Sequence, residues 1–313
     1  GGSGYATIKE LTKASGVWSL ASARSALADG SWANVTKTAV SADTLMVAGG
    51  GGGGGPTSYD VGFGGGGAGG LIYQSGSLAL TTGCNTITIG GAGAVRTIGD
   101  DTTINFLTAK GGGKGAGCSP LDGGSGGGGN RATGAAGNAI QPAEPGYSSF
   151  YGFGNNGGPG NNPGTVAAGG GGGSGGAGAS SNPSNDGGNG GAGKDMAPSF
   201  PGTPLPNSGS FAGGGGGGAR CGGSGPNPGC GQAGGGNGGD PSTAGGTATA
   251  NTGSGGGGGG FCPPDAGAGG SGFAAIKVPN APGCMAVSPG SNAIVTCGTT
   301  KTAKFLVTGV LTL

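Results

Sequence analysis

The sequence predicts a mainly irregular, all-β fold: a packed sandwich of polyglycine II helices, with a small β region formed by both flanks and a short N-terminal helix. Three observations lead to this prediction. Glycine supplies 93 of the 313 residues and comes in blocks rather than as single turn residues. Short β-branched runs lie on both sides of these blocks. Residues 1–44 differ from the rest, because they hold both tryptophans and no glycine block.

The glycine blocks need an ordering force that does not come from side chains. The purest blocks are 49–55, 169–173, 213–218 and 255–260. Glycine loses the most backbone entropy on folding, and fixing one residue costs about 1–2 kcal/mol. In an extended helix of three residues per turn, however, the unshielded N–H and C=O groups point outward. We therefore expect lateral main-chain hydrogen bonds between parallel glycine helices, each contributing about 0.5–1.5 kcal/mol net.

Two other structures of glycine-rich chains are alternatives. Collagen needs a strict Gly-X-Y period and about 15–20% proline or more, whereas this chain has 19 prolines and only local triplets. Plain disorder is the other alternative, because a chain with so few large apolar residues has little to bury.

The first expected element is a short helix near the N-terminus. Ser19 fits the N-cap, Leu20, Ala23 and Leu27 fall on one face, and Gly30 provides a stop signal. Trp18 and Trp32 flank the helix. The segment is either a small hydrophobic clasp or a module that attaches to a partner subunit.

Short apolar runs then predict strands on both sides of the glycine region. They are 44–48, 71–73, 77–80, 86–89, 103–107, 273–278, 293–295, 304–307 and 310–313. Little helix or strand is expected between residues 110 and 270. The predicted domains are an N-terminal attachment segment (1–43), the polyglycine II lattice with its flanking strands (44–278) and C-terminal β-strands (279–313).

Composition argues against several functions. Charged residues make up 8% of the chain and the net charge is +1, which does not favour nucleic-acid binding through phosphates. No apolar stretch approaches the roughly 18 residues of a membrane-spanning helix. The chain has no histidine, which removes His-dependent triads and most transition-metal sites. We expect a protein that is not an enzyme and has no cofactor or metal.

The seven cysteines predict disulfides. Cys284 and Cys297 flank a Pro-Gly-Ser turn, so they are expected to face each other across a hairpin. Cys221 and Cys230 close a loop rich in glycine and proline. The odd count leaves at least one thiol free or intermolecular. Free buried thiols and a metal site are alternatives, although no C-x₂-C pair is present.

Several stretches resemble the large glycine-rich domain of bacteriophage tail-fibre and tip-adhesin proteins, which also occurs in surface proteins of environmental bacteria. These are SGVWSLASARSALADGSW, TLMVAGGGGGGG, GGGGAGGLIYQSGSLALTTGCNTITIGGAGA, FLTAKGGGKG, GGGGGGFCPPDAGAGGSGFAAIKV and KFLVTGVLTL. The resemblance implies a rigid glycine sandwich whose tip loops bind a host receptor. It implies a structural fibre or tip protein of a virion, exposed outside the cell.

The resemblance also implies partners. They are a host cell-surface glycan or outer-membrane protein, and a fibre partner or second copy bound through the segment around Trp18 and Trp32. Neither nucleic acid nor membrane insertion is expected. The alternative is a secreted bacterial filament or biofilm-matrix subunit, in which the N-terminal segment or terminal strands complete a neighbour's sheet by strand addition.

Three glycine-poor segments are the candidate binding loops: 57–63, 139–163 and 195–210. Aromatic and Asn side chains on a rigid support suit the recognition of glycans or outer-membrane loops. The second and third segments are expected together at one end of the bundle, away from the C-terminal strands. Packing at the lattice edge or between subunits is the alternative. The candidate binding residues are Tyr59, Tyr147, Phe150, Tyr151, Phe153, Asn155, Asn156, Met196 and Phe200.

Overall fold

The computed structural model describes residues 39–55, 62–117, 120–130, 134–141, 151–160, 167–219, 227–260 and 265–313. These residues belong to one compact unit, Ala39–Leu313. Their regular secondary structure is all-β, in three antiparallel sheets.

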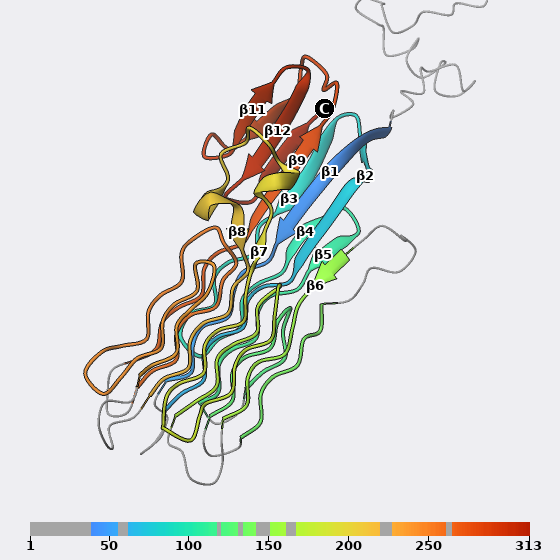
Figure 1. Cartoon of the computed structure of the whole chain (residues 1–313). Coiled ribbons are helices and arrows are strands. Elements are labelled where there is room, and N and C mark those ends of the chain that lie inside the picture. Colours follow the sequence, from blue (N-terminus) through green and yellow to red (C-terminus); the bar gives the residue numbers. More distant parts are fainter. Residues whose placement is uncertain are drawn as a thin grey trace, which may run out of the picture. The chain divides into compact units, whose positions relative to one another are not determined.

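Two sheets form a sandwich at one end of this unit (Figure 1). The six-stranded sheet has the order β11-β12-β9-β1-β2-β6, and the five-stranded sheet has the order β10-β13-β3-β4-β5. The strands of the first sheet are β1 (Ala39–Val47), β2 (Leu71–Thr81), β6 (Tyr151–Phe153), β9 (Phe273–Val278), β11 (Ala293–Cys297) and β12 (Thr300–Phe305). Those of the second are β3 (Cys84–Thr88), β4 (Thr102–Ile104), β5 (Leu107–Ala109), β10 (Ala286–Ser288) and β13 (Gly309–Thr312).

The central strands of the six-stranded sheet are buried on both faces. In β1, Met46 packs into the core between the two sheets, whereas Leu45 and Val47 point to the opposite face. That opposite face is covered by residues 194–211, which we call the Pro-rich excursion. It contains the two-stranded sheet of β7 (Lys194–Asp195) and β8 (Ser210–Phe211) and the 3₁₀ helices η2 (Ala197–Ser199) and η3 (Pro206–Gly209). Burial on both faces explains why these strands read as continuous apolar runs.

The other described residues between β1 and β9 form what we call the glycine array. Its segments run side by side away from the sandwich (Figure 1). In segment 48–55, every third N–H donates to the same neighbouring segment. Those of Ala48, Gly51 and Gly54 donate to the carbonyls of Gly70, Gly67 and Gly64 at 2.9–3.1 Å. The intervening amides donate to segments 97–100 and 265–272, again at every third residue for each segment.

The carbonyl groups follow the same three-residue repeat. The carbonyls of Gly49 and Gly52 accept from segment 110–117, and those of Gly51 and Gly54 accept from segment 252–260. Segment 62–70 shows the same pattern. Its six hydrogen-bonded neighbours are segments 48–55, 110–117, 121–130, 167–175, 212–219 and 252–260. Inner segments are therefore cross-linked on all sides by main-chain hydrogen bonds, as the sequence predicts.

The close approach of these segments leaves no room for side chains. A Cβ atom on Gly171 would lie 1.9 Å from the carbonyl oxygen of Gly66, and one on Gly215 would lie 2.1 Å from that of Gly256. Both obstacles are backbone atoms held in hydrogen bonds, so neither can rotate away. Glycine at these positions is a steric requirement.

The fold-class prediction of a polyglycine II helix sandwich with a short N-terminal helix is wrong. The described residues hold no helix of seven or more residues, only the short η2 and η3, and their regular structure is all-β. The regular structure comes instead from the apolar runs, which pair as antiparallel strands, while the glycine segments bond to one another without forming regular elements. The helix expected at 19–30 lies outside the described residues. The expected scarcity of helix and strand between 110 and 270 is confirmed for the described part of that span.

Several strand predictions differ in their bounds. The runs 71–73 and 77–80 form the single strand β2, and 103–107 divides into the hairpin β4–β5 with Asn105 at φ 53°. Residues 279–313 are not a domain of their own, because β12 pairs with β9 and β13 pairs with β3. The sequence reading missed β6 and β10, since three-residue strands carry too little periodicity to be detected.

Valine at Gly171 or Gly215 is expected to disrupt the array. Overpacking costs typically about 1–3 kcal/mol, and the immovable carbonyl places these sites at the upper end, so we expect the melting temperature to fall by about 5 °C or more. Gly283→Val is the matched control, because nothing lies within 4 Å of a Cβ built there. Calorimetry of the three variants checks this. An equal melting temperature for Gly171→Val and Gly283→Val would contradict the steric account.

Candidate functional site

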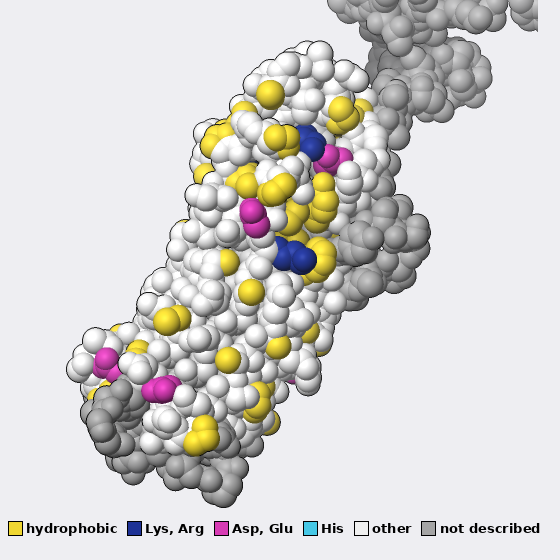
Figure 2. All heavy atoms as spheres, viewed as in Figure 1, with side chains coloured by type: hydrophobic (Ala, Val, Ile, Leu, Met, Phe, Trp, Pro, Cys, Tyr) yellow, Lys and Arg dark blue, Asp and Glu magenta, His cyan; other side chains and the backbone are white. Residues whose placement is uncertain are grey.

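The described unit has two distinct ends. The beginning of β1 and the C-terminus both lie at the sandwich end, whereas turns between array segments lie at the opposite end, which we call the far end (Figure 1). Two far-end turns are described, residues 182–186 and 240–243. Most of the visible array surface consists of backbone and uncharged polar side chains, and acidic side chains are visible at the far end as well as near the sandwich (Figure 2). Charged side chains of the array are therefore found at its turns.

The first far-end turn is organised by Asp186. Its carboxylate accepts hydrogen bonds from the Asn227 backbone N–H and from Asn182 Nδ2, both at 2.8 Å. The Asp186 N–H donates in turn to Asn182 Oδ1 at 2.9 Å. These donors favour the ionised carboxylate, so the Asn227 backbone bond, followed by the Asn182 side chain, lowers the pKa of Asp186.

Asp240 organises the second far-end turn. Its Oδ1 accepts from Ser242 Oγ and Ser242 N, both at 2.7 Å, and from Thr243 N at 2.8 Å. The Ser242 hydroxyl is the largest cause that lowers the pKa of Asp240, and the Ser242 backbone N–H comes next. Both carboxylates therefore stay ionised to a lower pH than an ordinary Asp side chain does.

Asn and Asp side chains complete the three-residue repeat where the array ends. Asn189 Oδ1 accepts from the Cys230 N–H at 2.8 Å, three residues along from the Asp186–Asn227 contact. Asn156 Oδ1 accepts from the Ala139 N–H at 2.8 Å. Inside the array, a main-chain carbonyl of a neighbouring segment accepts from each such N–H. At the edge, where no further segment follows, the side-chain oxygen is the acceptor. This edge role was missed by sequence reasoning; the i, i+3 spacing of Asp186 and Asn189 was the signal that could have revealed it.

Asn155 and Asn156 were predicted to bind a receptor, and the structure gives both of them partners within the array. Asn155 Nδ2 donates to the Gly173 carbonyl at 2.8 Å. Phe153 is half-buried at the end of β6, with the Lys194 ammonium 3.9 Å from its ring centroid. Tyr151 opens β6 opposite Tyr73. Tyr59, Tyr147 and Phe150 lie outside the described residues, and their binding role stays a prediction.

Met196 and Phe200 are core residues, which corrects their prediction as binding residues. They are 5% and 1% exposed and pack beneath the Pro-rich excursion. The excursion lies on the six-stranded sheet, where Lys277 Nζ donates to the Ser199 carbonyl at 2.8 Å and Lys304 Nζ to that of Pro204 at 2.9 Å. It therefore does not lie away from the C-terminal strands, as expected. The apolar outer face of the sheet needs this cover.

The expected disulfide between Cys284 and Cys297 is not formed. Both thiols are free and exposed, as are those of Cys84 and Cys230. Cys284 precedes β10 in one sheet and Cys297 ends β11 in the other, so the two cysteines do not flank a hairpin. Cys221, the expected partner of Cys230, lies outside the described residues.

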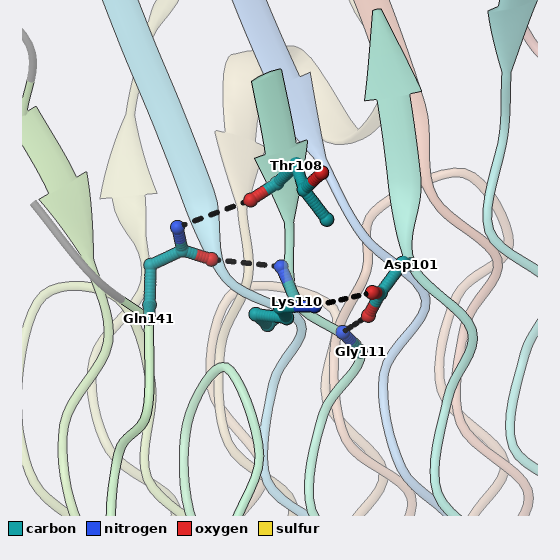
Figure 3. A network of polar contacts seen from close by, with 5 residues as sticks. All are labelled: Asp101, Thr108, Lys110, Gly111 and Gln141. Carbon is teal, nitrogen blue, oxygen red and sulfur yellow. Dashed lines mark hydrogen bonds and ion pairs between the residues drawn. The ribbon is translucent and has the colours of Figure 1, made fainter. Parts of the chain in front are cut away.

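A polar network fixes the junction between the sandwich and the array (Figure 3). Gln141 Oε1 accepts from the Lys110 N–H at 2.8 Å, and its Nε2 lies 3.5 Å from the Thr108 carbonyl oxygen. Asp101 accepts from the Gly111 N–H and from Lys110 Nζ, both at 2.8 Å. One amide side chain thus covers the outer edge of β5 just as the chain leaves the sheet.

A cavity of about 370 Å³ lies between the Pro-rich excursion and the six-stranded sheet. The Lys277–Asp43 ion pair, with a 2.7 Å N–O distance, forms one wall. Its charged groups are already paired, so it presents no free charge to a ligand. Within the described residues, no helix could cross a membrane, and no group of three His, Cys, Asp or Glu side chains gathers as metal ligands do.

The Asp186 turn gives a pH prediction. Because the folded-state pKa lies below the ordinary value of 3.8, the hydrogen bond to Asn227 is present above pH 3.8 and is lost as pH falls through the lowered pKa. The Asn227 amide resonance should therefore titrate with an apparent pKa below 3.8 in an NMR series. The Gly191 amide, which donates to the Gly171 carbonyl, is the control and should not titrate. A midpoint at or above 3.8 for Asn227 would rule out this arrangement.

Gln141 gives a stability prediction. Gln141→Met leaves the Lys110 N–H without its acceptor, and a lost partner of this kind costs about 1–3 kcal/mol. Gln141→Glu keeps the acceptor and should cost less. Denaturant unfolding of the two variants compares them, and equal losses would show that side-chain packing rather than the acceptor matters.

Comparison with known proteins supports a family assignment. Neither a curated protein nor a solved structure is similar enough to the chain to count as a match. A family model described as glycine-rich domain matches residues 27–279. This match covers the glycine array together with β1 and β9, which begin and end it. The chain therefore belongs to the glycine-rich domain family.

Proposed function

We propose that this protein is a non-enzymatic fibre or tip protein of a bacteriophage, exposed outside the cell, that binds a host surface receptor through the far-end turns. The observation that carries the proposal is that the two ends of the described unit differ. The sandwich holds the ends of the unit, and the array presents its turns at the opposite end (Figure 1). This arrangement suits a molecule that is attached at one end and binds at the other.

The stiffness of the array supports a presenting role. An inner segment such as 62–70 is bonded to six others, so it cannot bend without breaking bonds to all of them. Turns held on a rigid support lose little entropy when they bind, which favours affinity. Polar turns on a rigid scaffold are also where recognition usually lies.

The far-end turns have a chemistry suited to polar partners. Asp186 and Asp240 stay ionised, and Ser242 and Thr243 are exposed beside them. The segment that holds Tyr59 is flanked by Gly55 and Gly62. Both belong to array segments that end at the far end, as the Gly54–Gly64 hydrogen bond indicates. Exposed carboxylates and hydroxyls can exchange hydrogen bonds with the hydroxyl groups of a sugar. We infer a host glycan or a polar outer-membrane loop as the partner.

The segment with Tyr147 and Phe150 is the second candidate surface. Its flanking residues, Gln141 and Tyr151, lie at the junction with the sandwich rather than at the far end. The two surfaces can therefore be tested separately.

Alanine substitutions at the two surfaces test the proposal. Tyr59→Ala with Ser242→Ala changes the far end, and Tyr147→Ala with Phe150→Ala changes the segment near the junction. Binding is measured on a glycan array and on outer-membrane vesicles, with the melting temperature as the folding control. We expect binding to fall at least tenfold, or about 1.4 kcal/mol, for the far-end pair only.

Two results would contradict the proposal. One is binding that survives the far-end substitutions but is lost with the pair near the junction. The other is assembly of the purified protein into open head-to-tail filaments in electron micrographs, which would favour the secreted filament subunit.

A further inference from the structure

The edges of the two large sheets differ in how they are protected. The edge strand β5 is covered by the Gln141 amide (Figure 3). The edge strands β6 and β10 have three residues each, and Pro289 follows β10 directly. These are devices by which proteins prevent unwanted strand pairing. The fourth edge strand, β11, has none of them.

Strand β11 is an open pairing surface. It has five residues, Ala293 to Cys297, without a charge or a proline, and three of them are exposed. Its only strand partner in the described part of the sheet is β12. Figure 1 shows it at the outer side of the sandwich.

The geometry of the β11–β12 hairpin shows which backbone groups are free. The connection is the two-residue turn Gly298–Thr299, with Gly298 at φ 60°. In such hairpins the residues flanking the turn, here Cys297 and Thr300, exchange both backbone hydrogen bonds, and the pattern then alternates. The N–H and C=O groups of Ile294 and Thr296 therefore point away from β12, toward the open side.

We propose that β11 pairs with β11 of a second copy of this chain, antiparallel and around a two-fold axis. The register that overlaps all five residues places Val295 opposite Val295 of the second copy and Ile294 opposite Thr296. It uses every free backbone group of Ile294 and Thr296, giving four intermolecular hydrogen bonds. Two six-stranded sheets then become one continuous sheet.

Charge placement favours a second copy as the occupant. The strand itself is uncharged, so two identical strands do not repel each other. The nearest lysines lie on β12, opposite Thr296 and Ala293. Lys301 Nζ donates to the Pro282 carbonyl at 3.0 Å, and Lys304 Nζ donates to that of Pro204 at 2.9 Å. Both ammonium groups are bonded within their own chain.

This interface goes beyond receptor binding. It lies at the sandwich end, so pairing leaves the far-end turns of both copies open to a receptor. Because a two-fold pairing of identical edges closes on itself, it yields a dimer and not a filament.

Sedimentation of the whole chain tests the interface. The wild-type protein is expected to sediment as a dimer. Thr296→Pro removes only an N–H that points away from β12, and edge strands tolerate proline at such positions. It should abolish the dimer with the melting temperature of the monomer retained, while Thr296→Ala, the matched control, should remain dimeric. A monomeric wild type would overturn the proposal.

Cross-linking gives a second test that does not depend on the proline variant. Val295→Cys, made in a variant whose seven native cysteines are all replaced by serine, places two thiols directly opposite each other across a pair without backbone hydrogen bonds. With copper phenanthroline as oxidant, most of the protein should become a covalent dimer. Thr299→Cys in the same background carries an exposed thiol in the turn and should not cross-link. Equal cross-linking of the two variants, or none at residue 295, would overturn the proposal.

Discussion

The structure depends on one interaction, the lateral N–H···O=C bond between glycine segments, repeated at every third residue. Ordering a residue costs about 1–2 kcal/mol, and one bond returns about 0.5–1.5 kcal/mol net. Order is therefore favoured most where residues use both backbone groups, as in segment 62–70 with its six neighbours. Because every backbone N–H needs an acceptor, Asn and Asp side chains supply acceptors at the array edge, where no further segment lies alongside.

The β-sandwich supplies the alignment that the glycine segments cannot define for themselves. Strand β1 continues directly into segment 48–55, segment 62–70 leads into β2, and segment 265–272 leads into β9. The side chains of these strands fix the register, and the polar network at Asp101 and Gln141 holds the chain where it leaves the sheet. A repeating backbone pattern alone would allow segments to slip by three residues. The apolar core prevents this.

Sequence reasoning predicted the parts of the structure that depend on backbone chemistry and failed where side-chain packing decides. Glycine blocks can order only through main-chain bonds, so lateral cross-linking was predictable, although describing the fold as a helix sandwich was wrong. Met196 and Phe200 could not be placed, because a proline-rich segment reads as a loop whether or not it covers an apolar sheet. Asn155 was assigned to binding because an edge acceptor and a recognition side chain look the same in one sequence.

The pairing of distant segments has a consequence for how the chain acquires its structure during synthesis. Segment 48–55 donates hydrogen bonds to residues 267 and 270, more than two hundred positions later. Two of its neighbours, segments 252–260 and 265–272, do not exist until most of the chain has left the ribosome. Folding dominated by such distant contacts is slow, and the N–H groups of Gly50 and Gly53 lack their acceptors until segment 265–272 is made. Segments 252–260 and 265–272 therefore act as the closing element for the first segment of the array.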